Sequence, residues 1–165
     1  MKKYLLILVT IIAACNNGPV KNAGQDKLER NKAVVLRSQG YINSKDFDKF
    51  LNKCAPGYRE YFNGGPAMAD LDSIKTVYGD GFTVFDIRGE DFKAYASGDT
   101  VLVTGTWSGK FVRPFHDTAP NNKTFKFDDV DIYVLNSEGR LASHRSTQGS
   151  AELFWQLGLL KTASK

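Results

Sequence analysis

Hydrophobic residues recur with helical spacing through the first half of the chain, as far as about residue 78. A seven-residue repeat predicts an amphipathic helix that starts near Asp26, and its core positions are Leu28, Val35 and Ile42. Ser44 is a good N-cap for a second helix, which the sequence Pro56-Gly57 is expected to end. The apolar stripe of this second helix consists of Phe47, Phe50, Leu51 and Cys54.

Further along, the periodicity changes from helical to two-fold. A short third helix is predicted from Pro66 to Tyr78, because Gly79-Asp80-Gly81 follows it. The strand-like segments after it are Phe82–Arg88, Phe92–Ala96, Thr100–Phe111, Thr124–Leu135 and Arg140–Gln148. An apolar helix, Ala151–Leu160, closes the chain. Helices followed by meandering strands predict one α+β domain over residues 26–161, with an antiparallel sheet.

The N-terminus has the order of basic, apolar and small residues that is typical of a secretory signal. Its apolar run, residues 4–14, is about half the ~20 residues needed to span a bilayer. Ile12-Ala13-Ala14-Cys15 resembles a bacterial lipobox, which implies cleavage after residue 14 and lipid attachment to Cys15. Residues 15–25 would then form a flexible tether. The alternative is a plain signal peptide in which Cys15 is incidental. We expect a lipid-anchored protein of the bacterial cell envelope, with the choice of inner or outer membrane left open.

Composition excludes some classes of partner. Without residues 1–14, the chain has 20 basic against 18 acidic residues, and no stretch concentrates Lys and Arg. Nucleic acid is therefore not an expected partner. Cys54 is the only cysteine besides Cys15, so no internal disulfide is expected, and a buried apolar cysteine is the simplest interpretation. The two histidines lie far apart in the sequence without metal-ligand spacing, and we expect neither a metal nor another cofactor.

The segment Thr124–Leu135 carries the strongest candidate chemistry. Alternation places two carboxylates among aromatic rings on one face, which consists of Phe125, Phe127, Asp129, Asp131 and Tyr133. If this face is buried, desolvation is expected to raise the carboxyl pKa values and to suit the groups to acid–base work. The opposite face, with Val130, Ile132 and Val134, is also a plausible core face, and in that case the carboxylates would be solvated or in a dimer contact. Periodicity alone does not choose between the two.

Several motifs occur together in an order that resembles one family. They are Gly98-Asp99, Trp107, Ala119-Pro120-Asn121-Asn122-Lys123, Val130-Asp131-Ile132-Tyr133, Glu138-Gly139-Arg140 and the terminal segment Leu153–Leu160. Over residues 27 to 161 the chain is similar to the SnoaL-like polyketide cyclase (ester cyclase) family of the nuclear-transport-factor-2-like superfamily. This resemblance implies a cone-shaped fold, in which a strongly curved sheet wraps helices around one apolar cavity. It also implies a homodimer formed through the sheet.

The resemblance also points to two catalytic candidates. Asp131 matches the aspartate of the family's strand, and His144 matches the family's histidine in the last strand. A neutral imidazole at His144 could polarise a carbonyl or pair with Asp131; a hydrogen-bonded structural histidine is the alternative. The sequence departs from the family pattern at Ser143, Arg145, Ser146 and Gln148, where acidic residues or tryptophan are expected. These departures put cyclase chemistry in doubt.

Three functions are compatible with these residues. The favoured one is an anchored domain that holds a small apolar or amphipathic molecule, as a degenerate cyclase. The second is an active cofactor-free cyclase or isomerase that uses Asp131 and His144 as acid and base. The third is a non-catalytic module for dimerisation or partner docking. The residues expected to contact a ligand are Tyr58, Tyr61, Tyr78, Trp107, Asp129 and Tyr133.

Overall fold

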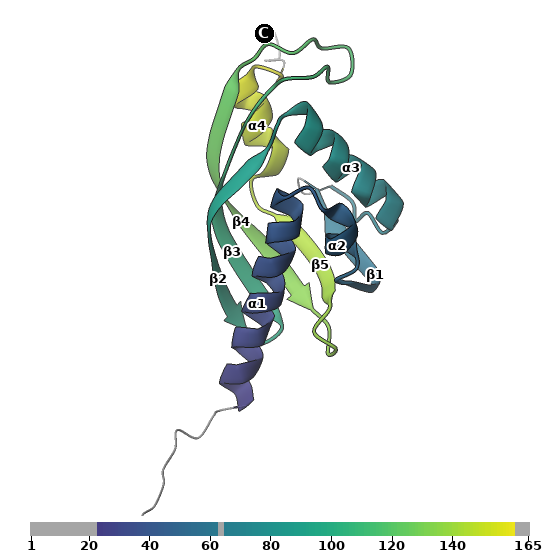
Figure 1. Ribbon diagram of the computed structural model, residues 1–165, viewed down its shortest axis with the longest axis vertical. Coiled ribbons are helices and arrows are strands. Elements are labelled where there is room, and N and C mark those ends of the chain that lie inside the picture. The colour runs from purple at the N-terminus through teal and green to yellow at the C-terminus, as the bar shows by residue number, and fades with distance from the viewer. Residues whose placement is uncertain (1–22, 63–64, 161–165) are drawn as a thin grey trace, which may run out of the picture.

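A five-stranded curved sheet and four helices make up the computed structural model, which describes residues 23–62 and 65–160. The elements are α1 (Ala23–Asn43), α2 (Phe47–Leu51), β1 (Cys54–Tyr61), α3 (Leu71–Val84), β2 (Arg88–Ser97), β3 (Thr100–Lys110), β4 (Thr124–Leu135), β5 (Leu141–Ser146) and α4 (Gly149–Leu157). The strand order is β1-β5-β4-β3-β2, and the sheet curves around α1, α2 and α3, with α4 near one end (Figure 1). The α+β cone expected from the sequence is therefore confirmed, but the expectation of a wholly antiparallel sheet is wrong, because β1 pairs with β5 in parallel. The signal segment, Cys15 and the tether up to residue 22 lie outside the described residues.

The sheet bends at Gly105, where the side chain of Phe92 lies close to the backbone of β3. β3 and β4 pair in unbroken antiparallel register from Thr100–Val134 to Lys110–Thr124. On the other side of β3, the pairing with β2 shifts between Glu90 and Lys93, which face Thr106 and Thr104. Gly105 lies opposite this bulge, and a Cβ at this position would overlap the ring of Phe92. A bulge increases the local twist of a strand, so this position helps to curve the sheet.

Residues 54–61 form a strand, so the prediction that Cys54 continues the preceding helix is wrong. α2 ends at Leu51 and is capped by Asp46, whose side chain accepts from the backbone N–H of Lys49; Ser44 is not the cap. Pro56 and Gly57 lie inside β1, where the register with β5 shifts. β1 is an edge strand whose outer side pairs with Met68 at Glu60, away from Pro56, and proline is tolerated at such an edge because its missing N–H interrupts no ladder.

α3 also extends further than predicted, through Gly79 and Gly81 to Val84. Phe82 therefore belongs to this helix, and the next strand begins only at Arg88. Glycine inside a helix costs about 1 kcal/mol relative to alanine. The side chains of Ile74, Tyr78 and Phe82 are all buried on one face of α3, and this packing outweighs the low helix propensity.

The hydrophobic core lies between the sheet and the helices and includes Cys54. Burial raises the pKa of the Cys54 thiol to about 12, so this cysteine stays protonated, as expected of a core residue. Among the helices that the structure describes, none is both long and apolar enough to cross a membrane.

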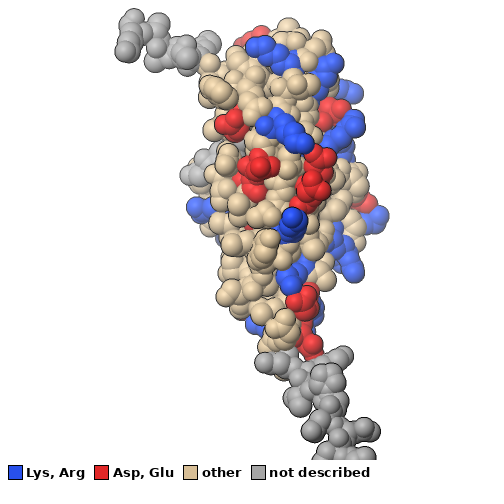
Figure 2. Space-filling model, turned by 90° about the vertical axis from the view of Figure 1, so that its left-hand side faces the viewer, with Lys and Arg blue, Asp and Glu red and all other residues tan. Residues whose placement is uncertain are grey.

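The outer face of the sheet mixes charged and apolar side chains (Figure 2). Lys126 forms an ion pair with Glu90 there at 2.7 Å, while Tyr95 and Leu102 are exposed. A homodimer through this face stays a prediction.

Candidate functional site

An apolar cavity of about 430 Å³ lies between the concave face of the sheet and the helices. Aromatic rings form much of its wall, among them Phe62, Phe82, Phe85, Trp107, Phe127 and Phe154. This volume lies within the range of about 300–1,000 Å³ that is typical of small-molecule pockets. His116 and Asp80 also belong to its lining, and both are exposed.

β4 turns its two carboxylates toward the interior. Phe125, Asp129, Asp131 and Tyr133 are buried, whereas Lys126 and Asp128 on the opposite face are exposed. Asp129 and Asp131 both line the cavity. The alternative arrangement, in which Val130, Ile132 and Val134 face the core and the carboxylates face solvent, is therefore wrong.

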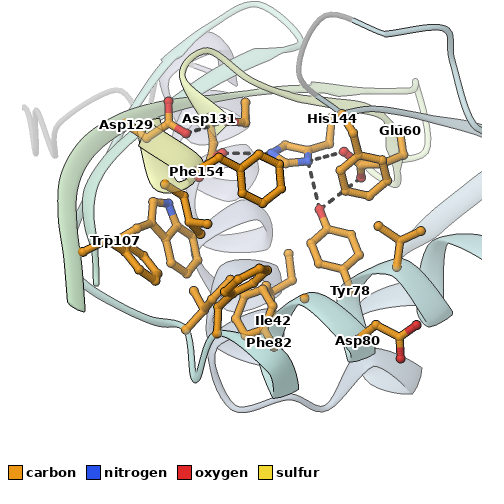
Figure 3. A pocket seen from close by; sticks show the side chains of 18 of the residues that line it. Ile42, Glu60, Tyr78, Asp80, Phe82, Trp107, Asp129, Asp131, His144 and Phe154 are labelled. Atoms are coloured by element: carbon orange, nitrogen blue, oxygen red, sulfur yellow. Dashed lines mark hydrogen bonds and ion pairs between the residues drawn. The ribbon is translucent and has the colours of Figure 1, made fainter. Parts of the chain in front are cut away.

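Three ionisable side chains from three strands form a continuous chain at one end of the cavity. His144 Nε2 lies 3.1 Å from Asp131 Oδ1, and His144 Nδ1 lies 2.7 Å from Glu60 Oε1. All three residues are buried and line the cavity. Figure 3 shows the imidazole between the two carboxyl groups, with Tyr78 directed toward it from α3. We call Glu60, His144 and Asp131 the acid–histidine chain.

His144 carries a proton at neutral pH. Burial by itself would lower the pKa of His144, but Glu60 and Asp131 together raise it to about 10. Each ring N–H then donates to one carboxylate. The ring also stacks on Tyr133, with centroids 4.3 Å apart. The expectation of a neutral imidazole at this position is wrong, while the expected pairing of His144 with Asp131 is present.

The family of this chain follows from a direct comparison. Residues 32–157 match the family model of the SnoaL-like polyketide cyclases. The chain belongs to this family. The comparison with curated proteins gave no match.

Solved structures share the fold of this SnoaL-like domain at low sequence identity. A candidate SnoaL-like polyketide cyclase from Jannaschia sp. CCS1 is 18% identical, with a TM-score of 0.72, over 87% of this chain and 100% of its own. A candidate polyketide cyclase from Xanthomonas campestris pv. campestris is 15% identical, with a TM-score of 0.72, over 78% and 97%. AclR from Streptomyces galilaeus, a candidate hydroxylase, is 18% identical, with a TM-score of 0.68, over 81% and 99%. Such likeness shows the fold and does not choose a reaction.

Glu60 is the residue of this SnoaL-like site that the sequence analysis missed. β1 pairs with β5 in parallel, and this register places Glu60 directly beside His144. Glu60 Oε2 accepts hydrogen bonds from the hydroxyls of Tyr58 at 2.6 Å and Tyr78 at 3.2 Å. Burial alternates along Tyr58, Arg59 and Glu60, but the residue types do not, and Pro56-Gly57 suggested a helix end, so no pattern in the sequence indicated a strand here. Ser143, Ser146 and Gln148 occupy positions where the family resemblance led us to expect acidic residues. Glu60, from another strand, supplies an acidic side chain next to His144.

Asp129 has a structural role beside the site, because both of its carboxylate oxygens accept hydrogen bonds from neighbouring segments. One of its oxygens accepts from the backbone N–H groups of Val130, Thr147 and Gln148 and from the Thr147 hydroxyl, and the other accepts from the Ser146 hydroxyl. Burial alone would raise the pKa of Asp129, but these hydrogen bonds lower it overall. The expected upward shift is wrong for this residue. Asp129 fixes the segment between β5 and α4 to β4.

The remaining predicted residues divide into two groups. Tyr61, Tyr78 and Trp107 line the cavity. Tyr58 and Tyr133 lie outside its lining, and both are fully buried in the core instead. Tyr133 donates to Gln39 Oε1 at 2.6 Å, and Gln39 Nε2 donates to Asp131 Oδ2 at 2.5 Å. Tyr58 and Tyr133 thus support Glu60 and Asp131 from behind.

Proposed function

We propose that this SnoaL-like domain is a cofactor-independent acid–base enzyme that acts on a small, mainly apolar, ring-containing molecule. The observation that supports this most is the position of the acid–histidine chain, at one end of an otherwise aromatic cavity of about 430 Å³. Ring systems would pack against Phe82, Trp107 and Phe154, while the polar end of the ligand would meet Asp131.

Asp131 is the proposed base. Each of its oxygens accepts one hydrogen bond, from His144 and from Gln39, and a carboxylate oxygen can accept a second. Asp131 would remove a proton from the ligand, become a carboxylic acid, and return the proton to a different atom of the same ligand. The electron pair that the proton leaves would form the new double bond or close the ring. This sequence leaves the enzyme unchanged and suits an isomerisation or an intramolecular cyclisation.

His144 is proposed to position Asp131 and to balance its charge. Both ring N–H groups are already bonded, to Glu60 and to Asp131, so the imidazolium is not the group that exchanges protons with the ligand. Gln39 fixes the second oxygen of Asp131, and Tyr133 fixes Gln39. The carboxylate is thus held in one orientation before a ligand arrives, which is how a preorganised site lowers a barrier.

A second candidate is a domain that holds its ligand without turnover. Within residues 23–62 and 65–160, no buried side-chain nitrogen or oxygen lacks a hydrogen-bond partner. Because this hydrogen-bond network is complete without a ligand, it is compatible with a rigid pocket that only holds a ligand as well as with a catalytic site.

Exchange of carbon-bound hydrogen for deuterium separates the two candidates. With 2-tetralone in D₂O, the enzyme is expected to speed uptake of deuterium next to the carbonyl, and Asp131→Asn should reduce this rate by about 10²–10⁴-fold, the usual contribution of a general base. Asp128→Asn is the matched control, since Asp128 lies on the outer face of the same strand. Unchanged exchange in Asp131→Asn would contradict the role of Asp131. Binding of the probe without exchange by the native protein would favour the holding function.

We further propose that Cys15 is lipidated and anchors the domain in the bacterial cell envelope. The basis is the signal-like order of residues 1–15. Full-length protein made in a bacterium with a radiolabelled fatty acid is expected to carry label and to sediment with membranes. Cys15→Ser should lose both properties, whereas Cys54→Ser, which changes a buried core thiol, should keep the label. A native chain without label would contradict the anchor.

A further inference from the structure

We infer that the cavity selects ligands whose polar group donates hydrogen bonds, ideally a cation, and that it rejects ligands whose polar group is a carboxylate. This inference rests on the proposed function, because it specifies the substrate class of the same cavity. Three independent features support it: the donors already in use, the acceptors left over, and the charge of the lining.

The hydrogen-bond donors at the polar end of the cavity are engaged with carboxylates of the protein. The two ring N–H groups of His144 point to Glu60 and Asp131. The hydroxyl of Tyr78 donates to Glu60, and the hydroxyl of Ser146 donates to Asp129. A ligand carboxylate would have to compete with a buried carboxylate of the protein for each of these protons, and hydrogen bonds to a charged group are stronger than neutral ones.

Acceptor capacity remains at the same place. Oδ1 and Oδ2 of Asp131 each accept one bond, from His144 and Gln39, and Oε1 of Glu60 accepts one, from His144. Because a carboxylate oxygen can accept two bonds, each of these three atoms can accept a donor from a ligand. A hydroxyl, a phenol or an ammonium group would therefore add hydrogen bonds there without displacing any.

The charge of the lining acts in the same direction. The acidic residues in the wall are Glu60, Asp80, Asp129 and Asp131, and the described part of the lining contains no Lys or Arg. Only the His144 imidazolium offsets them in the interior. Aromatic faces such as Phe82 and Trp107 also attract cations and are poor partners for anions. An anionic ligand would thus lose solvation without meeting a free cation.

Four probes with one ring system test this inference. We would measure binding of 2-naphthylmethylammonium, 2-naphthylmethanol, 2-acetylnaphthalene and 2-naphthoate by titration calorimetry near pH 7. The ammonium is expected to bind at least about tenfold more tightly than the carboxylate, with the alcohol tighter than the ketone. Asp131→Asn should reduce the ratio of ammonium to carboxylate affinity, while Asp128→Asn should leave that ratio unchanged.

The outcomes separate the two proposals. If the carboxylate binds as tightly as the ammonium, the inference on ligand class is wrong, although binding in the cavity stands. If none of the four probes binds to folded protein, both proposals fail. The comparison within the native protein needs no variant, so a variant that does not fold would leave the test intact.

Discussion

Glu60→Ala is expected to lower the free energy of unfolding by about 3–5 kcal/mol, the usual cost of removing one partner from a buried ion pair. Glu60 is fully buried and is one of the two carboxylates that hold the His144 cation. Its removal also deprives the hydroxyls of Tyr58 and Tyr78 of their acceptor. The measurement is chemical denaturation followed by circular dichroism at pH 7.

Two variants make this result interpretable. Glu60→Gln keeps an oxygen for the tyrosine hydroxyls but removes the charge, so it should cost clearly less than alanine. Glu90→Ala removes an acidic side chain from an ion pair with Lys126 on the outer face of the sheet and should change stability little. A Glu60→Ala protein as stable as the native one would show that the acid–histidine chain contributes nothing to the fold.

The stability of the native protein is expected to fall as pH rises from neutral, because of His144. In the folded state the pKa of His144 is raised to about 10, whereas in the unfolded chain it is near 6.5. Below about pH 6.5 both states hold the proton and the stabilisation is complete. Between about 6.5 and about 10 the folded state holds more protons, so stability decreases with pH, and above about 10 this contribution is gone.

The slope approaches about 1.4 kcal/mol per pH unit for one proton, so the free energy of unfolding should fall by roughly 2 kcal/mol between about pH 6.5 and about pH 8.5. An unfolded cysteine, with a usual pKa of about 8.5, begins to ionise only at the upper end of this window, so Cys54 adds about 0.4 kcal/mol at most. His144→Gln should flatten the dependence. His116→Gln is the matched control, since His116 is the other histidine and is exposed, and it should keep the slope. A native protein with equal stability at both pH values would contradict the assignment of a buried imidazolium.

Local pattern was enough to predict the class of the fold and part of the site. The bounds of Thr124–Leu135, the closing helix and the family motifs all depend on short stretches of sequence, and the structure and the family comparison bear them out. The order of elements was only partly predicted, because β1 lies between α2 and α3. The same stretches identified Asp131 and His144, which the structure brings within 3.1 Å of each other. Side-chain alternation within one strand is a local property, so these features could be predicted.

Contacts between residues far apart in the sequence determined the features that the sequence did not predict. Which face of β4 is buried depends on the helices that pack on it, since Gln39 of α1 bonds to Asp131 and Leu153 of α4 packs near Phe125. The sequence of β4 by itself allowed either face. Gly79 and Gly81 were expected to end the helix, but α3 continues to Val84, because the burial of Phe82 stabilises its last part. Glu60 became part of the site only through the parallel pairing of β1 with β5, 84 residues apart in the sequence. Such a pairing leaves no periodic signal in either strand, because its free energy comes from contacts that exist only once the sheet has formed.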